Sequence, residues 1–436
     1  MINIGFVVPT YWYYFKPFRN QPLVALYLLT VLEDRIGDKA NVSLIDLRGI
    51  AEENLMFHIP ERDVYFYSVG TQDIHEVSGI VAELRSIYPK AKHIAGGPHI
   101  NLFPEECGRV FDAIVQREGE ESIVEVVTDV LASNLKPIYR RSEAVNLDDY
   151  PYTSRKYLPR RAVVDTGLLP GDYQELPATS FIFSRGCPFD CYFCANSELT
   201  FGPVRVRSPH LVEEEIEYLK REYQIKGIAF KDDNSIQVNR KVAMAHLEAV
   251  GRTDIKWRGQ SRANGISPEV VTLAKEAGCV EIALGIESVS QSVLDNINKR
   301  LDIKEAKKYI QLLRNTGIGV RLNLILGLPG EPDDIVEQTL AFIDEAEPSS
   351  VIMAYLYPVP GSEIFKHPEK FGITINTTDW RRYSAVAGRF SEEESADIIF
   401  DYNDNVMPWG KGMDKEQIHD NYTRLQDILR ERGLNF

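Results

Sequence analysis

Residues 184–194 read SRGCPFDCYFC and place Cys187, Cys191 and Cys194 at a C-x3-C-x2-C spacing. The loop directly follows the apolar run 180–184, which we expect to be a strand. The chain contains 5 cysteines, an odd number, and disulfide pairing does not explain three of them crowded into one short loop of a large cytoplasmic chain. Close thiolates repel each other unless a cation lies between them, so the loop predicts a metal centre.

Two kinds of metal centre are compatible with this spacing. Three thiolates on one tight loop can hold three irons of a cubane [4Fe–4S] cluster, and no fourth cysteine is placed to take the last iron. An open iron can chelate an external ligand. The alternative is a structural zinc knuckle, which needs four protein ligands and would be completed by a distant histidine or by Cys279. Cys107 and Cys279 are otherwise most simply small buried residues.

Outward from the loop toward the C-terminus, strand-like and helix-like stretches alternate up to about residue 357. The predicted strands are 180–184, 227–230, 255–259, 280–284, 319–326 and 351–356. The predicted helices are 209–222, 240–250, 268–277, 290–298, 303–316 and 333–346. Six strands paired with helices indicate a partial (β/α)6 TIM-like barrel, whose chemistry gathers at the carboxyl ends of the strands.

Outward toward the N-terminus, residues 1 to about 135 show a second α/β alternation. Short apolar runs separated by helical patterns predict a Rossmann-like, doubly wound parallel sheet. Such sheets bind ligands beyond the carboxyl ends of their strands, where the strand order reverses. The pair Gly96 and Gly97 at one of these ends would let the backbone approach a large ligand closely, although such glycines also simply make turns.

Prolines interrupt the pattern between these two regions, and no sustained period runs through residues 136–178. Because proline restricts itself and the residue before it, this stretch is interpreted as a linker. The predicted organisation is therefore a Rossmann-like domain over 1–135, a linker over 136–178, a partial barrel over 179–370 and a small mixed C-terminal region over 371–436.

Composition narrows the class of protein. A chain of 436 residues with 44% hydrophobic and 26% charged residues is typical of a globular protein of two or three domains. No apolar stretch approaches the roughly 20 residues of a membrane span, and the start of the chain does not resemble a secretory leader, so we expect a cytoplasmic protein with no membrane partner. The net charge of −15 argues against an extended basic surface that would bind nucleic acid, and it favours a small-molecule substrate.

The cysteine loop, with an aromatic residue before its last cysteine and a position at the opening of a six-strand β/α domain, resembles that of the radical S-adenosylmethionine (SAM) superfamily. The resemblance implies that Cys187, Cys191 and Cys194 bind a [4Fe–4S] cluster and that SAM chelates its open iron. It also implies an enzyme that splits SAM to a 5′-deoxyadenosyl radical, which abstracts hydrogen from an unactivated carbon. The barrel interior would keep water away from that radical.

The resemblance also implies contacts to SAM at successive strand ends. The residues that occupy the corresponding positions are Phe193 beside the adenine, Asp232 or Asp233 at the methionyl amino group, Arg262 at the carboxylate, Glu287 at the ribose and Gly327 in the adenine-side loop. Many relatives show Gly-Gly-Glu where this sequence has aspartates, so the choice between the two acids stays open. Each position also has a structural alternative as a helix cap, a surface ion pair or a turn.

The N-terminal domain resembles the cobalamin-binding domain of one large class of radical SAM enzymes. The resemblance rests on Pro22-Leu23 at the first helix, on residues 96–99 (GGPH) and on residues 118–120 (EGE). The cofactor-binding residues that it implies are Ser68, Gly96, Gly97, Pro98, Glu118 and Gly119. The cofactors expected for the chain are thus a [4Fe–4S] cluster, SAM and cobalamin.

Two positions depart from the cobalamin-binding pattern. Relatives that ligate cobalt carry Asp-x-His-x-x-Gly after the first strand, whereas residues 73–79 (DIHEVSG) are one residue longer and follow the third. His75 is therefore interpreted as a helix-start residue, which is compatible with cobalamin bound without a histidine ligand. Arg117 stands where relatives usually have glycine, and an arginine would be strained there if the position needs a positive φ.

These features predict a cobalamin-dependent radical SAM enzyme that methylates an unactivated carbon of a small molecule, such as a natural product or a cofactor. A low-potential donor such as flavodoxin or ferredoxin would supply electrons. The alternative within the class is a cyclase, ring-contracting or rearranging enzyme without methyl transfer. The alternative from another class is a non-catalytic metal-binding or sensor protein. Methylthiotransferases are disfavoured because they need a second cluster.

No motif in the sequence reveals the substrate or a catalytic acid or base. The residues that we expect to shape the substrate site are the aromatic loop 10–15 (TYWYYF), Tyr355, Tyr357 and Arg382. The aromatic loop would either stack on a flat ligand or seal a domain interface. The tail segments 379–383 and 407–410 would either close over the site or only pack.

Overall fold

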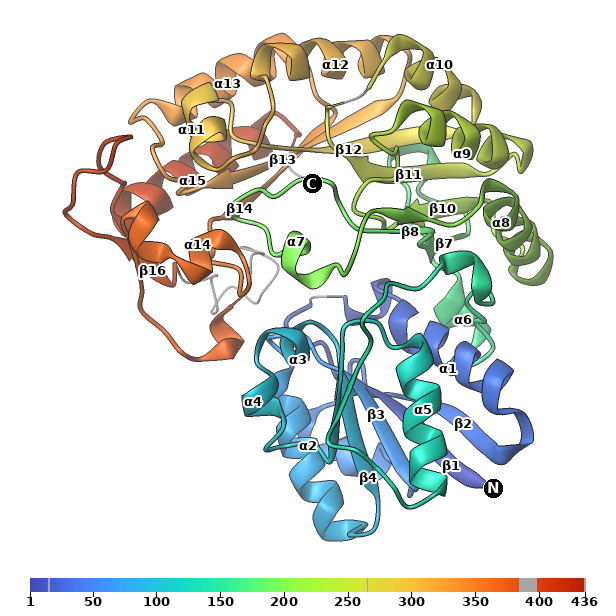
Figure 1. The fold of residues 1–436 in the computed structure, drawn as a ribbon. Coiled ribbons are helices and arrows are strands. Elements are labelled where there is room, and N and C mark those ends of the chain that lie inside the picture. The colour runs from blue at the N-terminus through green and yellow to red at the C-terminus, as the bar shows by residue number, and fades with distance from the viewer. Residues whose placement is uncertain (15, 265, 384–397, 435–436) are drawn as a thin grey trace. The chain divides into compact units, whose positions relative to one another are not determined.

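The computed structural model describes residues 1–14, 16–264, 266–383 and 398–434, and the chain forms two compact units (Figure 1). Unit 1 contains residues 1–163 together with the short segments 198–203 and 379–383. Unit 2 contains the described residues of 164–197, 204–378 and 384–436.

Unit 1 is built on a six-stranded parallel sheet. In the order in which they lie side by side, its strands are β2 (Ala40–Asp46), β1 (Ile2–Val8), β3 (Val64–Ser68), β4 (Lys92–Gly96), β5 (Ala113–Gln116) and β6 (Ile138–Arg140). The chain starts in the middle with β1, places β2 on one side and all later strands on the other. The strand order thus reverses between β1 and β3, and such a reversal opens a ligand-binding crevice at the carboxyl edge.

Helices cover both faces of this sheet. The helices are α1 (Leu23–Ile36), α2 (Ile74–Ile87), α3 (Pro98–Leu102), α4 (Pro104–Cys107), α5 (Glu120–Leu131) and the short α6 (Arg160–Val163). Buried residues of α1 and α5 belong to one hydrophobic cluster and those of α2 to another. Two separate cores on the two faces confirm the doubly wound sheet expected from the sequence. β6 and α6 lie within residues 136–178, where the sequence predicts a linker.

Unit 2 is built on a second six-stranded parallel sheet, whose strands lie side by side in chain order. They are β7 (Ala178–Phe181), β10 (Gly227–Phe230), β11 (Lys256–Ser261), β12 (Cys279–Glu287), β13 (Gly319–Leu326) and β14 (Ser350–Tyr355). The helices between them are α8 (Pro209–Tyr223), α9 (Arg240–Arg252), α10 (Pro268–Glu276), α11 (Gln291–Asn296), α12 (Ile303–Asn315) and α13 (Ile335–Ala346). The sheet curves with these helices on its outer side (Figure 1), which confirms the partial (β/α)6 barrel.

Short elements complete the fold. They are the ribbon of β8 (Ser184–Arg185) and β9 (Arg205–Val206), helix α7 (Asn196–Leu199), helix α14 (Glu363–Lys366), the ribbon of β15 (Ile373–Ile375) and β16 (Phe400–Tyr402), and helix α15 (Lys415–Glu431). The 3-10 helices are Pro17–Arg19, Gly37–Lys39, Glu52–His58, Leu147–Asp149, Gly171–Tyr173, Pro368–Phe371 and Trp380–Arg382.

Local side-chain chemistry sets several helix starts in unit 2. The Asp302 side chain accepts hydrogen bonds from the backbone amides of Lys304 and Glu305 at 2.8 and 3.0 Å, which begins α12. Asp414 and Gln417 form a reciprocal capping box at the start of α15. Such caps satisfy backbone amides that have no partner in the first helical turn.

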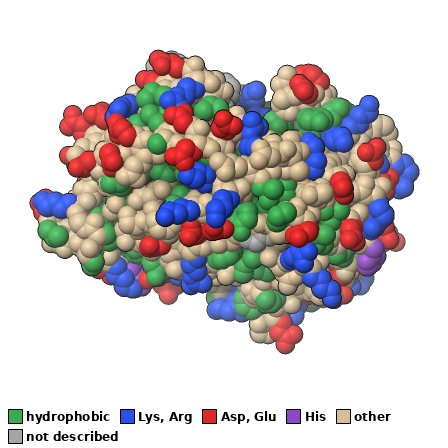
Figure 2. All heavy atoms as spheres, turned by 90° about the horizontal axis from the view of Figure 1, so that it is seen from above, with side chains coloured by type: hydrophobic (Ala, Val, Ile, Leu, Met, Phe, Trp, Pro, Cys, Tyr) green, Lys and Arg blue, Asp and Glu red, His purple; other side chains and the backbone are tan. Residues whose placement is uncertain are grey.

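None of the helices in the described ranges combines the length and the apolar character that crossing a membrane requires. On the face shown in Figure 2, acidic and basic side chains lie interspersed.

Candidate functional site

The cysteine loop of unit 2 begins at the carboxyl end of β7, the first strand of the barrel. One oxygen of Asp232, Oδ1, accepts hydrogen bonds from the amides of Phe183 and Ser184 at 2.9 and 2.6 Å and from the Ser184 hydroxyl at 2.7 Å. Asp232 follows β10, so this carboxyl ties the start of the loop to the neighbouring strand end. Asp233 reaches the same loop through a 3.2 Å hydrogen bond from the Gly186 amide to its Oδ2.

The two aspartates are not equivalent. Asp233 is exposed, whereas Asp232 is buried, and burial raises the pKa of Asp232 to about 7. The Asp232 Oδ2 atom is buried and makes no hydrogen bond within the part of the chain that the structure describes. Asp232 is thus the acid with a spare acceptor oxygen beside the cysteine loop, while both aspartates help to hold that loop.

Each cysteine sulfur of the loop receives an N–H donor. Asn234 Nδ2 lies 3.4 Å from Cys187 Sγ, Arg262 Nη1 lies 3.1 Å from Cys191 Sγ, and the Asn196 amide lies 3.4 Å from Cys194 Sγ. Hydrogen bonds of this kind favour thiolates, which are the form that binds iron. All three cysteines are free thiols in the structure.

Arg262 is held on several sides. Its guanidinium donates from Nε to Asn264 Oδ1 at 3.2 Å and from Nη2 to the Lys299 carbonyl, and its Cζ lies 3.7 Å from the centroid of the Phe189 ring. The structure therefore places Arg262 against the cysteine loop. The role that the resemblance implies for it, at the methionine carboxylate of SAM, remains a proposal.

The turn at residues 298–300 holds the cysteine loop in place through contacts with Asp190. Asn298 Nδ2 donates to the Asp190 carbonyl at 3.1 Å, and Arg300 Nη2 forms an ion pair with the Asp190 carboxylate at 2.9 Å. The Tyr192 amide also donates to the Ile297 carbonyl at 3.0 Å. The loop is thereby fixed to the segment that follows α11.

Glu287 ends β12 with a positive φ of 67°. Its Oε1 forms a 2.8 Å ion pair with Lys299, and both side chains are largely buried. The Lys299 ammonium also lies 5.6 Å from the centroid of the Phe193 ring. Phe193, Glu287 and Lys299 thus share one corner beside the cluster loop, so two of the predicted SAM contacts come together around a lysine that the sequence did not single out.

Gly327 ends β13 and has a φ of 86°. Its amide donates to Glu331 Oε2 at 2.8 Å, and its carbonyl accepts from the Tyr402 hydroxyl at 2.9 Å. A Cβ at this position would lie 3.2 Å from Ile418 of α15. Burial raises the pKa of Glu331 to about 8, so its carboxyl is largely neutral at pH 7. The C-terminal region therefore helps to shape this loop.

Sequence reasoning missed three residues of this site: Asn234, Lys299 and Glu331. Asn234 and Glu331 belong to the strand-end segments 230–234 (FKDDN) and 327–331 (GLPGE). Their positions at strand ends could therefore have indicated that they belong to the site. Lys299 lies in an irregular turn outside any motif, and only the folded chain brings it to Glu287.

The zinc-knuckle alternative does not fit this geometry. Cys279 is the first residue of β12 and lies at the amino edge of the sheet, whereas the cysteine loop follows the carboxyl end of β7. Among the described residues, no group of three or more His, Cys, Asp or Glu side chains is arranged to hold a single ion. A structural zinc site needs four closed protein ligands, whereas three thiols on one loop suit a [4Fe–4S] cluster with one open iron.

The glycine pair of unit 1 is explained by close packing of the protein itself. Gly97 has a φ of 103°, and a Cβ there would lie 2.7 Å from the Val69 amide nitrogen and 3.0 Å from Ser68 Oγ. A Cβ on Gly96 would lie 3.3 Å from the Val115 carbonyl oxygen. Pro98 is the first residue of α3. These residues bring the ends of β3 and β4 together at the carboxyl edge.

The segment after β5 connects that edge to other parts of unit 1. Arg117 has a φ of 68°, so the position does have the positive φ that glycine tolerates best. Its amide donates to Asn101 Oδ1 at 2.6 Å, and its guanidinium lies 4.0 Å from the Phe201 ring centroid. Glu118 Oε2 accepts from the Val145 amide at 2.7 Å, and Gly119 caps α5.

The described part of the aromatic loop after β1, residues 10–14, contacts the start of α2 within unit 1, whereas Phe15 lies outside the described residues. The amide and hydroxyl of Thr10 both donate to the Glu76 carboxylate at 2.9 Å. The rings of Tyr13 and Tyr14 lie 4.7 Å apart. Burial raises the pKa of Asp73, just before α2, to about 7. This edge thus carries closely packed, tilted aromatic rings beside the buried Asp73 carboxyl and the half-buried Glu76 carboxylate.

His99 is the buried imidazole of the same edge. Burial lowers the pKa of His99 to about 4, so the ring is neutral, and its Nε2 has no hydrogen-bond partner among the described residues. The Trp380 ring packs against His99 and Phe103 with centroid distances of 5.5 and 4.6 Å. His75 is the second residue of α2, as expected, and its Nε2 lies 3.7 Å from Asp379.

The two tail segments pack in different units. Segment 379–383 belongs to unit 1. In unit 2, Trp409 lies against Gly330, where an added Cβ would be 3.2 Å from the tryptophan Cβ. Tyr355 at the end of β14 forms a 2.9 Å hydrogen bond with His419 Nδ1, and its ring lies 4.3 Å from that of Tyr422 of α15 in a tilted arrangement.

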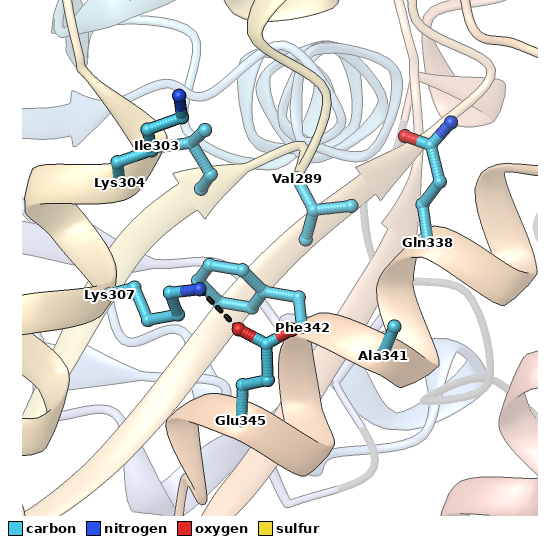
Figure 3. A pocket seen from close by; sticks show the side chains of 8 residues that line it. All are labelled: Val289, Ile303, Lys304, Lys307, Gln338, Ala341, Phe342 and Glu345. Carbon is cyan, nitrogen blue, oxygen red and sulfur yellow. Dashed lines mark hydrogen bonds and ion pairs between the residues drawn. The ribbon is translucent and has the colours of Figure 1, made fainter.

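A further cavity of about 260 Å³ lies between α12 and α13, and Figure 3 shows its lining. Val289, Ile303 and Phe342 form apolar walls, and Lys307 and Glu345 pair across it. Its lining contains none of the strand-end residues described above, so it is separate from the candidate site.

Comparison with known proteins agrees with this geometry. Residues 181–343 match the Radical SAM superfamily. Over 388 residues the chain is 28% identical to an uncharacterized methyltransferase of Pyrococcus horikoshii, covering 82% of this chain and 81% of that protein. It is 26% identical over 346 residues to the anaerobic magnesium-protoporphyrin IX monomethyl ester cyclase of Rubrivivax gelatinosus, covering 74% of this chain and 61% of that protein.

Among solved structures, the chain is similar to TsrM from Kitasatospora setae, a radical SAM methyltransferase determined with cobalamin and a [4Fe–4S] cluster bound. The TM-score is 0.70 at 15% identity, and the match covers 100% of this chain and 90% of that one. At this identity the likeness establishes the fold: a Rossmann-like unit followed by a partial barrel.

Proposed function

We propose, from the premise that residues 181–343 form a radical SAM domain, that this chain is a cobalamin-dependent radical SAM methyltransferase acting on an unactivated carbon of a small molecule. The match of residues 181–343 to the Radical SAM superfamily confirms the radical SAM resemblance of the cysteine loop. The single observation that carries the proposal is the loop itself, whose three cysteine sulfurs each receive an N–H donor.

The residues present fit a [4Fe–4S] cluster with one open iron. Cys187, Cys191 and Cys194 would hold three irons, and Cys279 lies at the opposite edge of the barrel sheet, so it does not supply a fourth thiolate. When bound, the cluster would supply the single electron that splits the sulfonium of SAM. Asp232, whose Oδ2 is buried without a partner among the described residues, is the acid that we favour for the methionyl amino group.

The protein's own residues would do the remaining work of binding and orientation. Phe193 and the Glu287–Lys299 pair would contact the nucleoside and the charged end of SAM beside the cysteine loop. Gly327 would belong to the loop on the adenine side, and its positive φ and the nearby Ile418 explain why glycine stands there. The barrel would exclude water from the radical.

Cobalamin is proposed for the carboxyl edge of unit 1. The observations that support it are the reversal of strand order between β1 and β3, the closely packed tyrosines of the aromatic loop and the buried His99 Nε2, which has no partner among the described residues. When bound, cobalamin would supply a methyl group for transfer. Ser68, Gly96, Gly97, Pro98, Glu118 and Gly119 would shape the edge around it rather than ligate cobalt. We also propose that a flavodoxin or ferredoxin delivers the electrons.

The second candidate function is a radical cyclase or rearranging enzyme without methyl transfer. The similarity to the Rubrivivax cyclase favours it, although the chain spans only 61% of that protein. The methyltransferase is preferred because the Pyrococcus relative, which is matched over more of both proteins, is named a methyltransferase.

The test is anaerobic reconstitution with iron, sulfide and hydroxocobalamin, followed by incubation with SAM and a reductant and mass spectrometry of the nucleosides. A methyltransferase yields S-adenosylhomocysteine beside 5′-deoxyadenosine, whereas a cyclase yields 5′-deoxyadenosine alone. Cys187→Ala should abolish 5′-deoxyadenosine, and Cys279→Ala is the matched control that should retain it. Zinc in the anaerobically purified chain, or four irons all held by protein side chains, would contradict the proposal.

A further inference from the structure

The cysteine loop is surrounded by donors that come from other strand ends. Asn234 follows β10 and donates to Cys187 Sγ, and Arg262 follows β11 and donates to Cys191 Sγ. Both residues are buried, with 2% and 8% of their surface exposed, so water competes little for these hydrogen bonds. In such surroundings each N–H donor acts strongly on the charge of its sulfur.

The two donors are locked into a single arrangement. The Arg262 amide donates to Asn234 Oδ1 at 3.3 Å, so the two residues position each other. The Asn234 carbonyl accepts from Gln237, and the Arg262 guanidinium is held by Asn264, by the Lys299 carbonyl and by the Phe189 ring. This amount of support is more than anchoring a surface loop requires, and it fixes the direction of both N–H groups.

Reduction adds one negative charge to an iron–sulfur cluster. Hydrogen bonds to the cysteine sulfurs and a nearby positive charge stabilise the reduced state, and therefore raise the reduction potential. Arginine keeps its charge at every relevant pH, and its planar group also aims a donor at the sulfur. Arg262 combines both effects, whereas Asn234 contributes a dipole alone.

We propose that Asn234 and Arg262 set the reduction potential of the cluster and bring it within reach of its electron donor. This inference rests on the proposed function, because it assumes a [4Fe–4S] cluster on the three cysteines. It assigns Arg262 a role at the Cys191 sulfur, in place of a role limited to the carboxylate of SAM. Both act through the ligands of the cluster and are therefore positioning residues.

The test is an EPR-monitored redox titration of the reconstituted full-length protein without SAM. Arg262→Met should make one-electron reduction about tenfold less favourable, the size expected for one hydrogen bond to a charged group, which corresponds to a midpoint about 59 mV more negative. Asn234→Ala should shift it in the same direction by less, because its contact is longer and its donor is neutral.

Two further variants separate an effect on the reduction potential of the cluster from an effect on the stability of the cysteine loop. Asn298→Ala is the matched control, since Asn298 donates an amide hydrogen bond to the same loop through Asp190 but contacts no cysteine sulfur in the described structure. Its midpoint should equal that of the wild type. Arg262→Lys keeps the charge, so it should lie between the wild type and Arg262→Met, and it serves if the methionine variant fails to assemble a cluster.

The outcomes distinguish this inference from the proposed function. If the variants give normal cluster signals with the wild-type midpoint, the inference is wrong. It is equally wrong if Arg262→Met raises only the KM for SAM, because Arg262 would then act on the methionine carboxylate. The Arg262→Met variant would also support the inference if it lost SAM cleavage with dithionite as the reductant but recovered it with titanium(III) citrate, a stronger reductant. A wild-type protein without a [4Fe–4S] cluster would instead contradict the proposed function.

Discussion

Asp232 has a structural role that is compatible with the cofactor-binding role proposed for it. Its Oδ1 takes three hydrogen bonds from Phe183 and Ser184, and its Oδ2 is buried without a partner in the described structure. Holding the start of the cysteine loop accounts for the burial of Asp232. Its spare oxygen, Oδ2, is left able to accept a hydrogen bond from a ligand. A carboxyl that only capped a helix would leave its second oxygen in water.

Glu331 gives a pH-dependent prediction at the same scale. The unfolded chain releases this proton near pH 4.5, whereas the folded chain holds it until about pH 8, because the carboxyl is buried. Its contribution to stability is therefore complete below pH 4.5 and is lost as the pH rises toward 8. Glu331→Gln should gain stability relative to the wild type by roughly 3 kcal/mol between pH 5 and pH 8, measured by urea unfolding.

The matched control for Glu331→Gln is Glu337→Gln. Glu337 is exposed, and a hydrogen bond from its own backbone amide, together with its ion pair with Arg424, lowers its pKa. This variant should not gain stability relative to the wild type as the pH rises. Equal pH profiles for the wild type and Glu331→Gln would show that Glu331 is already ionised in the folded protein.

At the scale of elements, unit 1 needs glycine at one position and merely tolerates it at another. The first position is Gly97, between β4 and α3, and the second is Gly79, within α2. Gly97 has a positive φ and no space for a Cβ, because the Val69 amide lies against it. Gly79 lies on the exposed side of α2, where nothing approaches within 4 Å of an added Cβ.

These two glycines give opposite predictions. Gly97→Ala should destabilise unit 1 by about 2 kcal/mol or more, since both the backbone conformation and the Val69 contact would have to change. Gly79→Ala should stabilise it by about 0.5–1 kcal/mol, because alanine favours a helix interior. Hydrogen exchange of the β3 and β4 peptides measures both effects. A neutral Gly97→Ala would mean that the β3–β4 edge adapts and does not need this glycine.

Arg117 is an exception to the same reasoning. The position has a φ of 68°, which favours glycine, yet it holds an arginine that contacts Phe201 and the Arg141 carbonyl. A cation–π contact and a hydrogen bond are of the size needed to offset the strain of one left-handed residue.

At the scale of the whole molecule, the C-terminal region completes unit 2. Helix α15 packs on β13, β14 and α13, with Leu425 fully buried in the barrel core. The amide of Val351 in β14 also donates to the Leu434 carbonyl at 2.8 Å. The last residues of the chain therefore support the strands whose carboxyl ends carry Gly327 and Tyr355.

Leu425→Ala tests this arrangement. It should lower the stability of unit 2 by about 3 kcal/mol, the cost of a large-to-small change in a packed core. Hydrogen exchange should rise in β13 and β14 but not in β1–β4 of unit 1. Arg424→Ala, on the exposed side of the same helix, is the control and should leave both units unchanged. Equal loss in both units would show that they unfold together.

Local patterns in the sequence were enough to predict the architecture and to single out the three cysteines that we propose as cluster ligands. Alternating apolar runs predicted both parallel sheets, and the spacing of three cysteines predicted the cluster loop, because both depend on residues that are close in the sequence. Within the two six-stranded sheets, the strand outside this pattern is β6, which is only three residues long and lies in a proline-rich stretch. Short edge strands leave too little periodicity to detect.

Only the tertiary structure decided what surrounds those ligands. Asn234 reaches Cys187 across 47 residues, and Arg262 reaches Cys191 across 71. Lys299 meets Glu287 because a turn after α11 folds back onto the end of β12. Such contacts depend on which strand ends become neighbours and on how their side chains are buried. That information is in the packing of the barrel, and no local spacing in the chain contains it.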